Sequence, residues 1–538
     1  MKSLSFLLAV SLAACGGTPK DGSTTPGGAG GGSASKPAAA GDVSLEIPVI
    51  QINGVLFEPQ ALGRPGMPLY APKNTKLTIA QQRTIFANTK DPVQKEAQAA
   101  VLATMLYQES KNKTGDEANK LVTEARQALR DAAAISKDKV DEVTLRLLGS
   151  YEIQLEDWAA AEKAWGGLVT RFPKNKETPE HKAWWTYALL RQYKNAEALE
   201  VVKAEAPSDK QPLLAYSIAW AKWRTGDDAG AWAAIVAAAN GWGQNPNRDA
   251  LERDVMLFAG RSKTPFEQVM PKLFALFNAK QPAQQYEVLA KLGLQAYQFA
   301  GRWADGVAAL DKALSVIGTA VPANDKVVIH YSEADFTVRL DQPEAASRHA
   351  KAALDALPAC GQKCSPQASQ DVVVGIYGIA RLFHLLYATA NDVRYYQPAH
   401  DLYQKTIPLI MDQNMRTQAK NDSVTLEKTL SNTKAGTGTH EKQAIGVLLQ
   451  RHNQEIQACY ETGLAANPKL GGTLALMLES DASGEIKGAA TEPKAGANEM
   501  SAVATCVIDH AKQWKLPKRG MAGNTRIKLT YTLSPKKA

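Results

Sequence analysis

Three patterns of hydrophobic and polar positions follow one another along the chain. Residues 43–59 alternate in part around an Asn-Gly turn signal, and they predict a short β-hairpin or an extended cap within residues 43–80. Residues 81–430 place apolar side chains three and four positions apart in Ala-rich stretches, which predicts successive helices. Residues 441–538 mix helix and strand patterns. The chain is therefore expected to be mostly α, with a small α+β domain at its end.

The helical stretch repeats at a nearly constant distance. Ala161, Ala196 and Ala231 are 35 residues apart, close to the 34 residues of a tetratricopeptide (TPR) repeat, which is a pair of packed helices. Small residues are needed where two helices touch, so the stretch resembles a TPR array; a non-repeating helical bundle is the alternative. Stacked hairpins leave a concave face that binds peptides or partner helices. The same small position is expected in later units at Gly306, Ala346 and Ala399.

Tryptophans are concentrated in the same stretch, since nine of the ten lie between Trp158 and Trp303. They indicate either the packed core of the repeats, which their positions favour, or an aromatic groove for a partner. Trp184 and Trp185 are neighbours on one predicted helix and cannot both point to the same side. One of these two is thus the best candidate for an exposed partner-binding contact.

A polar, Gly-containing linker at residues 431–440 precedes the C-terminal domain, residues 441–538. The pattern there predicts the order helix, strand, strand, helix, strand. The predicted elements are a helix at 445–464, strands at 473–479 and 485–489, a helix at 498–514 and a strand at 526–533.

Several short motifs lie along this domain. They are Cys459-Tyr460-Glu461, Asn467-Pro468-Lys469-Leu470-Gly471-Gly472, Gly484, Cys506-Val507, and Trp514 followed by Leu516-Pro517. Together they resemble the TonB-like C-terminal domain of AgmX/PglI-type envelope and gliding-motility proteins. That family more often has Phe where Leu516 stands. The resemblance implies a domain that packs on another envelope protein or adds a strand to it.

Four of the five cysteines form two candidate pairs. Cys459 and Cys506 fall on the two predicted helices of the C-terminal domain. In an oxidising envelope we expect them to form a disulfide, worth roughly 4 kcal/mol in the chain-entropy model; two buried free thiols are the alternative. Cys360 and Cys364 lie in a predicted loop, where a local disulfide is expected. Zinc is not expected, because no nearby residues complete a set of four ligands.

The first residues of the chain predict its cellular location. Lys2 precedes an apolar run that is too short to span a bilayer. The run ends in Leu-Ala-Ala-Cys15, which resembles the bacterial lipobox and implies a signal peptide at 1–14 and a lipidated Cys15; a plain signal peptide is the alternative. Residues 15–42, rich in Gly, Ser, Thr and Pro, predict a disordered tether. Gly16, where inner-membrane lipoproteins commonly have Asp, implies the outer membrane by analogy.

Composition and charge narrow the classes of partner. The 538 residues are 45% hydrophobic and 22% charged, as in ordinary globular proteins, and the net charge of +8 is too diffuse to indicate nucleic acid. From residue 512 onward, however, the chain carries basic residues and no acidic ones. This cluster indicates either an anionic partner, such as lipopolysaccharide or peptidoglycan, or a solvated face that protects an edge strand. The candidate contacts are Lys512, Lys515, Lys518, Arg519, Arg526 and Lys528.

Motifs for catalysis are absent from the sequence. The eight histidines form no His-Glu-x-x-His and no metal-ligand spacing, and neither Gly-x-Ser-x-Gly nor a phosphate-binding loop occurs. His452 lies on the apolar stripe of a predicted helix and is interpreted as a packing residue. We therefore expect no enzymatic activity, no cofactor and no metal site; an enzyme with an unrecognised site is the alternative.

These features together predict a lipoprotein anchored in the outer membrane and facing the periplasm, which acts as a protein-interaction scaffold or adaptor. Its expected partners are envelope proteins, held by the helical groove or by the C-terminal strand, and the membrane itself through the lipid. By resemblance, the process is gliding motility, secretion or envelope maintenance. The alternative is an envelope lipoprotein that binds cell wall or lipopolysaccharide through its basic C-terminal domain.

Overall fold

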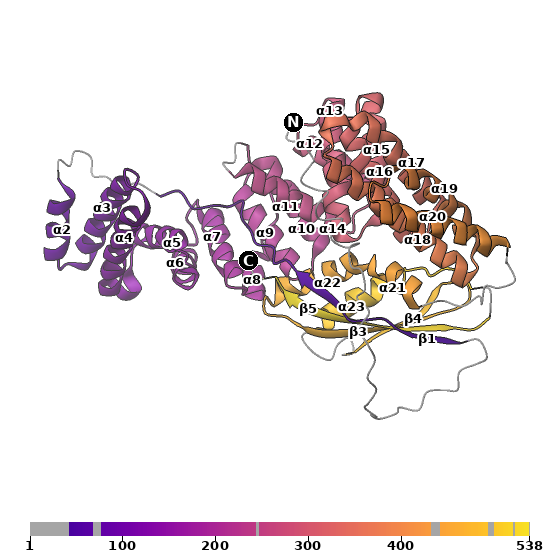
Figure 1. Ribbon diagram of the computed structural model, residues 1–538. Helices are drawn as coiled ribbons and strands as arrows, with labels where there is room; N and C mark the ends of the chain where they lie inside the picture. The colour runs from indigo at the N-terminus through magenta and orange to yellow at the C-terminus, as the bar shows by residue number, and fades with distance from the viewer. Residues whose placement is uncertain are drawn as a thin grey trace. The chain divides into compact units, whose positions relative to one another are not determined.

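The computed structural model describes residues 42–67, 77–243, 247–431, 442–492, 500–519 and 522–536 (Figure 1). Several expectations lie outside these residues: the signal peptide at 1–14, the lipidation of Cys15, the tether up to residue 41 and the linker from residue 432 onward.

The chain divides into two compact units. Unit 1 contains the residues up to Leu56, then Pro265–Leu464 and Pro468–Ala538, while unit 2 contains Phe57–Thr264 and Ala465–Asn467. The division cuts through the stretch at 81–430 that the sequence indicated as one array. The second half of that stretch belongs with the C-terminal domain.

Unit 2 consists of helices that pack against their neighbours in sequence. Its helices are α2 (Ile79–Asn88), α3 (Pro92–Ser110), α4 (Gly115–Ser136), η2 (Lys137–Lys139), α5 (Glu142–Gln154), α6 (Trp158–Arg171), α7 (Thr178–Arg191), α8 (Asn195–Val202), α9 (Pro212–Arg224), α10 (Asp228–Gly241) and α11 (Arg248–Arg261). Capping side chains explain where some of these helices begin. Asp157 and Asp227 each accept a hydrogen bond from a backbone N–H of the first turn, in α6 and α10.

Small residues let the helices of a pair approach closely, as the sequence predicted. A side-chain carbon added to Gly149 in α5 would lie 2.6 Å from the Trp165 ring in α6. The fourth residue of α6, Ala161, is fully buried. The equivalent residue of α8 is Ala198 and not the predicted Ala196, because α8 begins at Asn195 and leaves Ala196 exposed. The same fourth position holds the buried residues Ala231, Gly306, Ala346 and Ala399 in later helices.

Unit 1 contains a second set of packed helices. They are α12 (Phe266–Leu276), α13 (Pro282–Lys291), η3 (Leu292–Tyr297), α14 (Gln298–Ala300), α15 (Trp303–Ile317), η4 (Gly318–Ala320), α16 (Ala323–Arg339), α17 (Pro343–Cys360), η5 (Gly361–Lys363), α18 (Pro366–Ala390), η6 (Val393–Tyr395), α19 (Tyr396–Thr406), η7 (Ile407–Leu409) and α20 (Gln413–Ser431). Among the described helices, α18 alone is long and apolar enough to cross a membrane. Since 61% of its apolar window is buried inside the protein, α18 has the features of a core helix.

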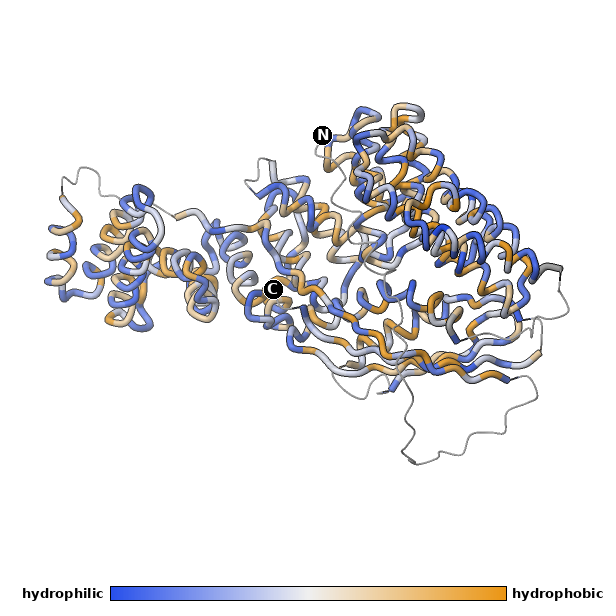
Figure 2. Tube along the Cα trace, in the orientation of Figure 1, coloured by the Kyte–Doolittle hydropathy of each residue, from blue (hydrophilic) through white to orange (hydrophobic). Residues whose placement is uncertain are grey.

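The C-terminal domain has the predicted order of elements. They are α21 (Lys442–Gln450), α22 (Asn453–Ala466), β3 (Gly472–Ser480), β4 (Ile486–Glu492), α23 (Ser501–Ala511) and β5 (Thr525–Pro535). The long helix predicted at 445–464 is broken at Arg451 and His452. The three helices lie on one face of the sheet (Figure 1). Hydrophobic residues recur along its strands (Figure 2).

The sheet is completed by the N-terminal end of the described chain. Strands β1 (Val43–Glu46) and β2 (Ile50–Gly54) both pair in parallel with β5, and the sheet continues from β5 to β3 and β4. The hairpin predicted at 43–59 is therefore wrong. The Asn-Gly pair lies at the end of β2 and makes no turn between β1 and β2. The backbone groups of both strands form their hydrogen bonds with β5. The extended alternative fits, but its partner is 482 residues away along the chain.

One hydrophobic core runs through unit 1. It joins Ile47, directly after β1, and Ile52 of β2 to Tyr377 and Phe383 of α18 and to Leu529 of β5. Burying these apolar side chains together stabilises the helices and the sheet as one body. The C-terminal domain is thus part of a larger folded unit, which it shares with the helices from α12 to α20.

Candidate functional site

Unit 2 holds a stretch of its own chain as a bound segment, Phe57–Gly63. This segment has neither helix nor strand until a turn at its end, and Ala61 and Leu62 are buried. The Phe57 ring meets the Trp223 ring of α9 edge to face at 6.3 Å. Two apolar anchors and an aromatic contact thus fix the segment on the helices.

Tyr216 of α9 is the central contact of the bound segment. Its hydroxyl oxygen accepts hydrogen bonds from the backbone N–H groups of Gln60 and Ala61, both at 3.0 Å. The same hydroxyl donates to Asp254 Oδ2 of α11 at 2.5 Å. A tyrosine hydroxyl has one hydrogen to donate and two lone pairs, so all of its capacity is used. Tyr216 and Asp254 are both fully buried.

Burial dominates the electrostatics around Asp254. It raises the pKa of the Asp254 carboxyl to about 6, although Arg253 and Tyr216 act in the opposite direction. Arg253 donates from Nε to Asp254 Oδ1 at 2.9 Å and from Nη2 to the Glu58 carbonyl at 3.2 Å. The carboxylate therefore orients both the tyrosine and the arginine that bind the segment.

The other end of the bound segment is held by charged side chains. Arg224 Nη2 donates to the carbonyl of Phe57 at 3.0 Å. The Glu58 carboxylate accepts from Tyr193 Oη at 2.7 Å and lies 3.5 Å from Arg191 Nη2. Burial lowers the pKa of Arg224 to about 10, so the guanidinium remains charged at neutral pH. Most of these bonds reach backbone groups, and such recognition depends little on the side chains of the bound segment.

The sequence did not reveal this site. Tyr216 and Arg224 stand in an apolar helix where they look like ordinary packing residues, and the residues they bind are more than 150 positions earlier in the chain. The one usable signal is a buried polar side chain, Asp254, in the apolar pattern of α11.

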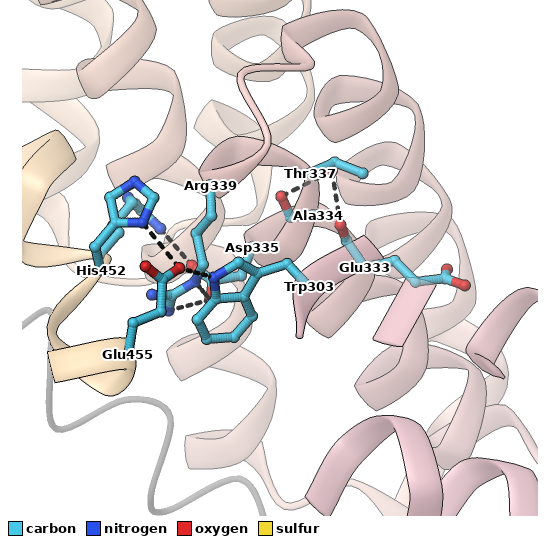
Figure 3. Close-up of polar contacts among 9 residues, drawn as sticks. Trp303, Glu333, Ala334, Asp335, Thr337, Arg339, His452 and Glu455 are labelled. Atoms are coloured by element: carbon cyan, nitrogen blue, oxygen red, sulfur yellow. Dashed lines mark hydrogen bonds and ion pairs between the residues drawn. The ribbon is translucent and has the colours of Figure 1, made fainter. Parts of the chain in front are cut away.

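A second buried polar cluster connects the helices of unit 1 to its C-terminal domain (Figure 3). Glu455 of α22 accepts hydrogen bonds from the indole N–H groups of Trp303 in α15 and Trp514. Its carboxylate also lies 3.1 Å from His452 Nδ1 and 3.9 Å from His510 Nδ1. Burial would raise the pKa of Glu455, but the two histidines and Trp303 hold it below its usual value.

His452 has the packing role that the sequence suggested. It is 3% exposed, and its ring stacks on Trp514 with the centroids 4.5 Å apart. Next to it, Arg451 and Arg339 of α16 both pair with the Asp335 carboxylate, and the Arg339 contact is 2.6 Å. These ion pairs cross from α16 to the break between α21 and α22, and they lock the C-terminal domain onto the helices.

The tryptophans proposed as partner contacts are not exposed. Trp184 is 2% exposed and stacks on Trp165, with the ring centroids 6.5 Å apart. Trp185 is partly buried, and a side-chain carbon added to Gly166 would lie 3.0 Å from its ring. Both belong to the packing between α6 and α7, which agrees with the interpretation of the tryptophans as core.

The basic residues of the C-terminal domain divide into three kinds. Lys512, Lys515 and Lys518 are exposed. Arg526 and Lys528 are also exposed, but they lie on β5 and pair with Glu479 at 3.5 Å and Glu46 at 3.9 Å. Arg519 is a correction to the expected set, because it is 7% exposed and its guanidinium Nη1 lies 3.5 Å from Thr525 Oγ1.

Both expected disulfides are present. Cys459 of α22 is joined to Cys506 of α23, and Cys360, the last residue of α17, is joined to Cys364. In the chain-entropy model the sequence separation of 47 gives the first bond about 4 kcal/mol, and the separation of 4 gives the second about 2 kcal/mol. The first bond also fixes the two helices that pack on the sheet.

Two groups of side chains converge closely enough to hold a metal ion, within the part of the chain that the structure describes. In one group, Cys459 and Cys506 lie beside His510, but the disulfide leaves no thiolate to bind a metal. The other group consists of His330, Glu333 and His349.

Comparisons with known proteins give distant structural similarities alone. No family model matches the chain, and no curated protein matches it. Among solved structures, the apo form of the quorum sensor NprR from B. thuringiensis is similar over 60% of this chain and 95% of its own, with 14% identity and a TM-score of 0.24.

Proposed function

We propose that this chain is a lipid-anchored envelope protein that acts as a non-catalytic scaffold or adaptor for other proteins. The observation that carries the proposal is the bound segment Phe57–Gly63. Helices of unit 2 hold its backbone through Tyr216, Arg224 and Arg253. Helical hairpins that bind a non-helical segment of their own chain have the contacts needed to bind such segments of a partner.

The proposed location of the protein in the cell is based on the sequence. The lipobox-like Leu-Ala-Ala-Cys15 supports lipidation, and Gly16 supports the outer membrane, with the folded units facing the periplasm. The two disulfides fit an oxidising compartment. The element order of the C-terminal domain fits the resemblance to the AgmX/PglI-type TonB-like domain, and that resemblance supports gliding motility, secretion or envelope maintenance as the process.

The described sheet has two edges at which a partner strand could be added. The N-terminal strands β1 and β2, beside β5, form one edge, and β4 forms the other. Addition at the β4 edge would pair a partner strand with Ile486–Glu492. Lys487 lies on this strand and is exposed, and such edge lysines discourage non-specific pairing.

The second candidate function is binding of an anionic envelope polymer, lipopolysaccharide or peptidoglycan. The exposed side chains of Lys512, Lys515 and Lys518 favour it, since they lie close together in sequence, although Glu485 lies beside Lys515. Binding of this kind weakens steeply with salt, whereas binding of a peptide segment by buried contacts does not.

The test is affinity capture from envelope extract at low and at high salt, with the full chain as bait. A matched bait carries Lys512→Glu, Lys515→Glu and Lys518→Glu, and a control bait carries the same reversal at the exposed Lys163, Lys174 and Lys176. The scaffold proposal expects all three baits to capture the same envelope protein at both salt concentrations. If no protein is enriched and lipopolysaccharide or peptidoglycan binds only to baits with the C-terminal lysines, the second function replaces it.

A further inference from the structure

The helical part of unit 1 contains a cluster of histidines and carboxylates that the scaffold role does not use. Glu333 of α16 is fully buried, and its Oε2 lies 2.9 Å from His330 Nδ1 and 2.8 Å from His349 Nδ1. His330 and Glu333 are three positions apart on one face of α16, and His349 comes from α17. One ligand atom from each residue lies within 4.8 Å of the other two.

The second oxygen of Glu333 points to a ligand. Oε1 is buried and makes no hydrogen bond with any described residue. A buried carboxylate oxygen without a partner costs free energy unless a cation or a donor reaches it. The side chain of Glu333 lies on the opposite side of α16 from Asp335, so the ion pairs with Arg339 and Arg451 do not satisfy it (Figure 3).

Charge in the neighbourhood favours a cation as well. Asp311 of α15, whose side chain is exposed, interacts with Glu333 and adds a second carboxylate to the cluster. Two carboxylates and two imidazoles thus meet between three helices.

We propose that His330, Glu333 and His349 bind one divalent transition-metal ion, with Asp311 beside it. Zinc fits this donor set best, because it takes imidazole nitrogen and carboxylate oxygen at about 2.0–2.2 Å in tetrahedral sites. Two imidazole ligands argue against calcium and magnesium, which prefer oxygen. Three protein ligands leave a fourth position for Asp311 or water. The partly exposed ring of His330 gives the ion a path from solvent.

No metal was expected from the sequence because the ligands come from different helices. The pair His330-x-x-Glu333 is the one local signal, and it is common on solvated helices. Only the packing of α16 against α17 brings His349 to the same carboxylate. The site lies in unit 1, apart from the residues of the bound segment in unit 2, so its test is independent of the scaffold proposal.

The test is equilibrium dialysis of the full chain with Zn²⁺ after removal of metals by EDTA. The chain carries Cys15→Ser so that this thiol does not bind zinc. We expect one zinc per chain. His349→Ala should lower the affinity at least about 100-fold, beyond the 10–100-fold that is typical of changes to outer-shell partners. His400→Ala, which removes a partly exposed histidine of α19 outside the cluster, should leave the affinity unchanged.

Folding is checked separately by circular dichroism and thermal unfolding. Glu333→Gln keeps the shape of the side chain but removes its charge, and it should lose zinc while the protein remains folded. Zinc should also raise the melting temperature of the wild type and not that of His349→Ala or Glu333→Gln. If the folded wild type binds no zinc, or if His349→Ala and Glu333→Gln bind it as tightly, the cluster is a buried ion-pair network and the proposal is overturned.

Discussion

Asp42 accepts a hydrogen bond through Oδ1 from the backbone N–H of Asn524 at 2.8 Å, although 482 residues separate the two. The contact begins the parallel pairing of β1 with β5. The chain segment that the sequence identified as a cap before the helices is therefore the edge of the C-terminal sheet. Unit 1 is closed by residues from both ends of the described chain.

Ile52→Ala tests this closure. Ile52 lies opposite Leu533 in the sheet and is 5% exposed, so its truncation leaves a cavity in the core of unit 1. We expect a loss of about 2–4 kcal/mol in the free energy of unfolding, measured with urea. The neighbouring Gln51 is exposed, and Gln51→Ala should change the free energy of unfolding by less than about 0.5 kcal/mol. Equal effects of both substitutions would contradict the pairing.

Tyr216→Phe tests the hold on the bound segment. The change removes the acceptor of two backbone N–H groups and the donor to Asp254, and it leaves these buried groups without their partner. We expect a cost of about 1–3 kcal/mol and faster hydrogen exchange at Gln60 and Ala61. Tyr396→Phe, at a partly exposed tyrosine of α19, is the matched control and should change neither. Unchanged exchange in Tyr216→Phe would rule out the hydroxyl as the main contact.

The raised pKa of Asp254 predicts a pH dependence. The folded pKa of about 6 exceeds the ordinary aspartate pKa of 3.8, so the folded state binds the proton more tightly. The contribution of this group is fully present below about pH 4 and is lost as the pH rises through 6, about 3 kcal/mol in total. The difference in unfolding free energy between wild type and Asp254→Asn should follow this curve from pH 4 to 7. A difference that is flat with pH would show that Asp254 titrates normally.

Glu455→Gln tests the cluster that joins the helices of unit 1 to its C-terminal domain. The carboxylate accepts from Trp303 and Trp514 and faces His452, so its replacement leaves a buried histidine and two indoles without an anionic partner. We expect a loss of about 3 kcal/mol at neutral pH. Because the pKa of Glu455 is lowered, the loss should shrink as the pH falls through that pKa.

Urea unfolding, followed by tryptophan fluorescence, measures this loss. Glu492→Gln, at an exposed residue of β4, serves as the control and should have little effect. A Glu455→Gln protein as stable as the control would mean that the cluster does not hold the two parts of unit 1 together.

Local patterns explain what could be predicted from the sequence. The order of elements in the C-terminal domain follows from side-chain periodicity, and the buried small residues Ala161 and Ala231 follow from close helix packing. Asp227 caps α10 because its side chain reaches the first free backbone N–H groups. Each of these features depends on residues within a few positions of one another.

What the sequence missed depends on contacts between distant residues. Alternation in β1 and β2 shows that they are strands but not that β5 is their partner. Helix α8 begins two positions later than the repeat spacing predicts, so Ala198 and not Ala196 takes the buried fourth position. A shift of two positions is enough to turn a residue from one side of a helix to the other, because one turn has only 3.6 residues. Arg519 looks like part of a basic surface until the chain folds it back towards Thr525. Buried polar residues such as Tyr216 acquire their roles only through tertiary packing.

The most direct test of the account is whether unit 2 binds the bound segment as a separate peptide. In the full chain, Phe57–Gly63 is replaced by an equally long run of Gly and Ser residues. Tyr216 and Arg224 then no longer hold the native segment. A fluorescent peptide of residues 55–64 should bind this chain saturably, by anisotropy, and not the wild type, whose own segment competes at high effective concentration. Tyr216→Phe in the replaced chain should weaken binding about tenfold or more. No binding to a replaced chain that remains folded would contradict the claim that these helices recognise such segments.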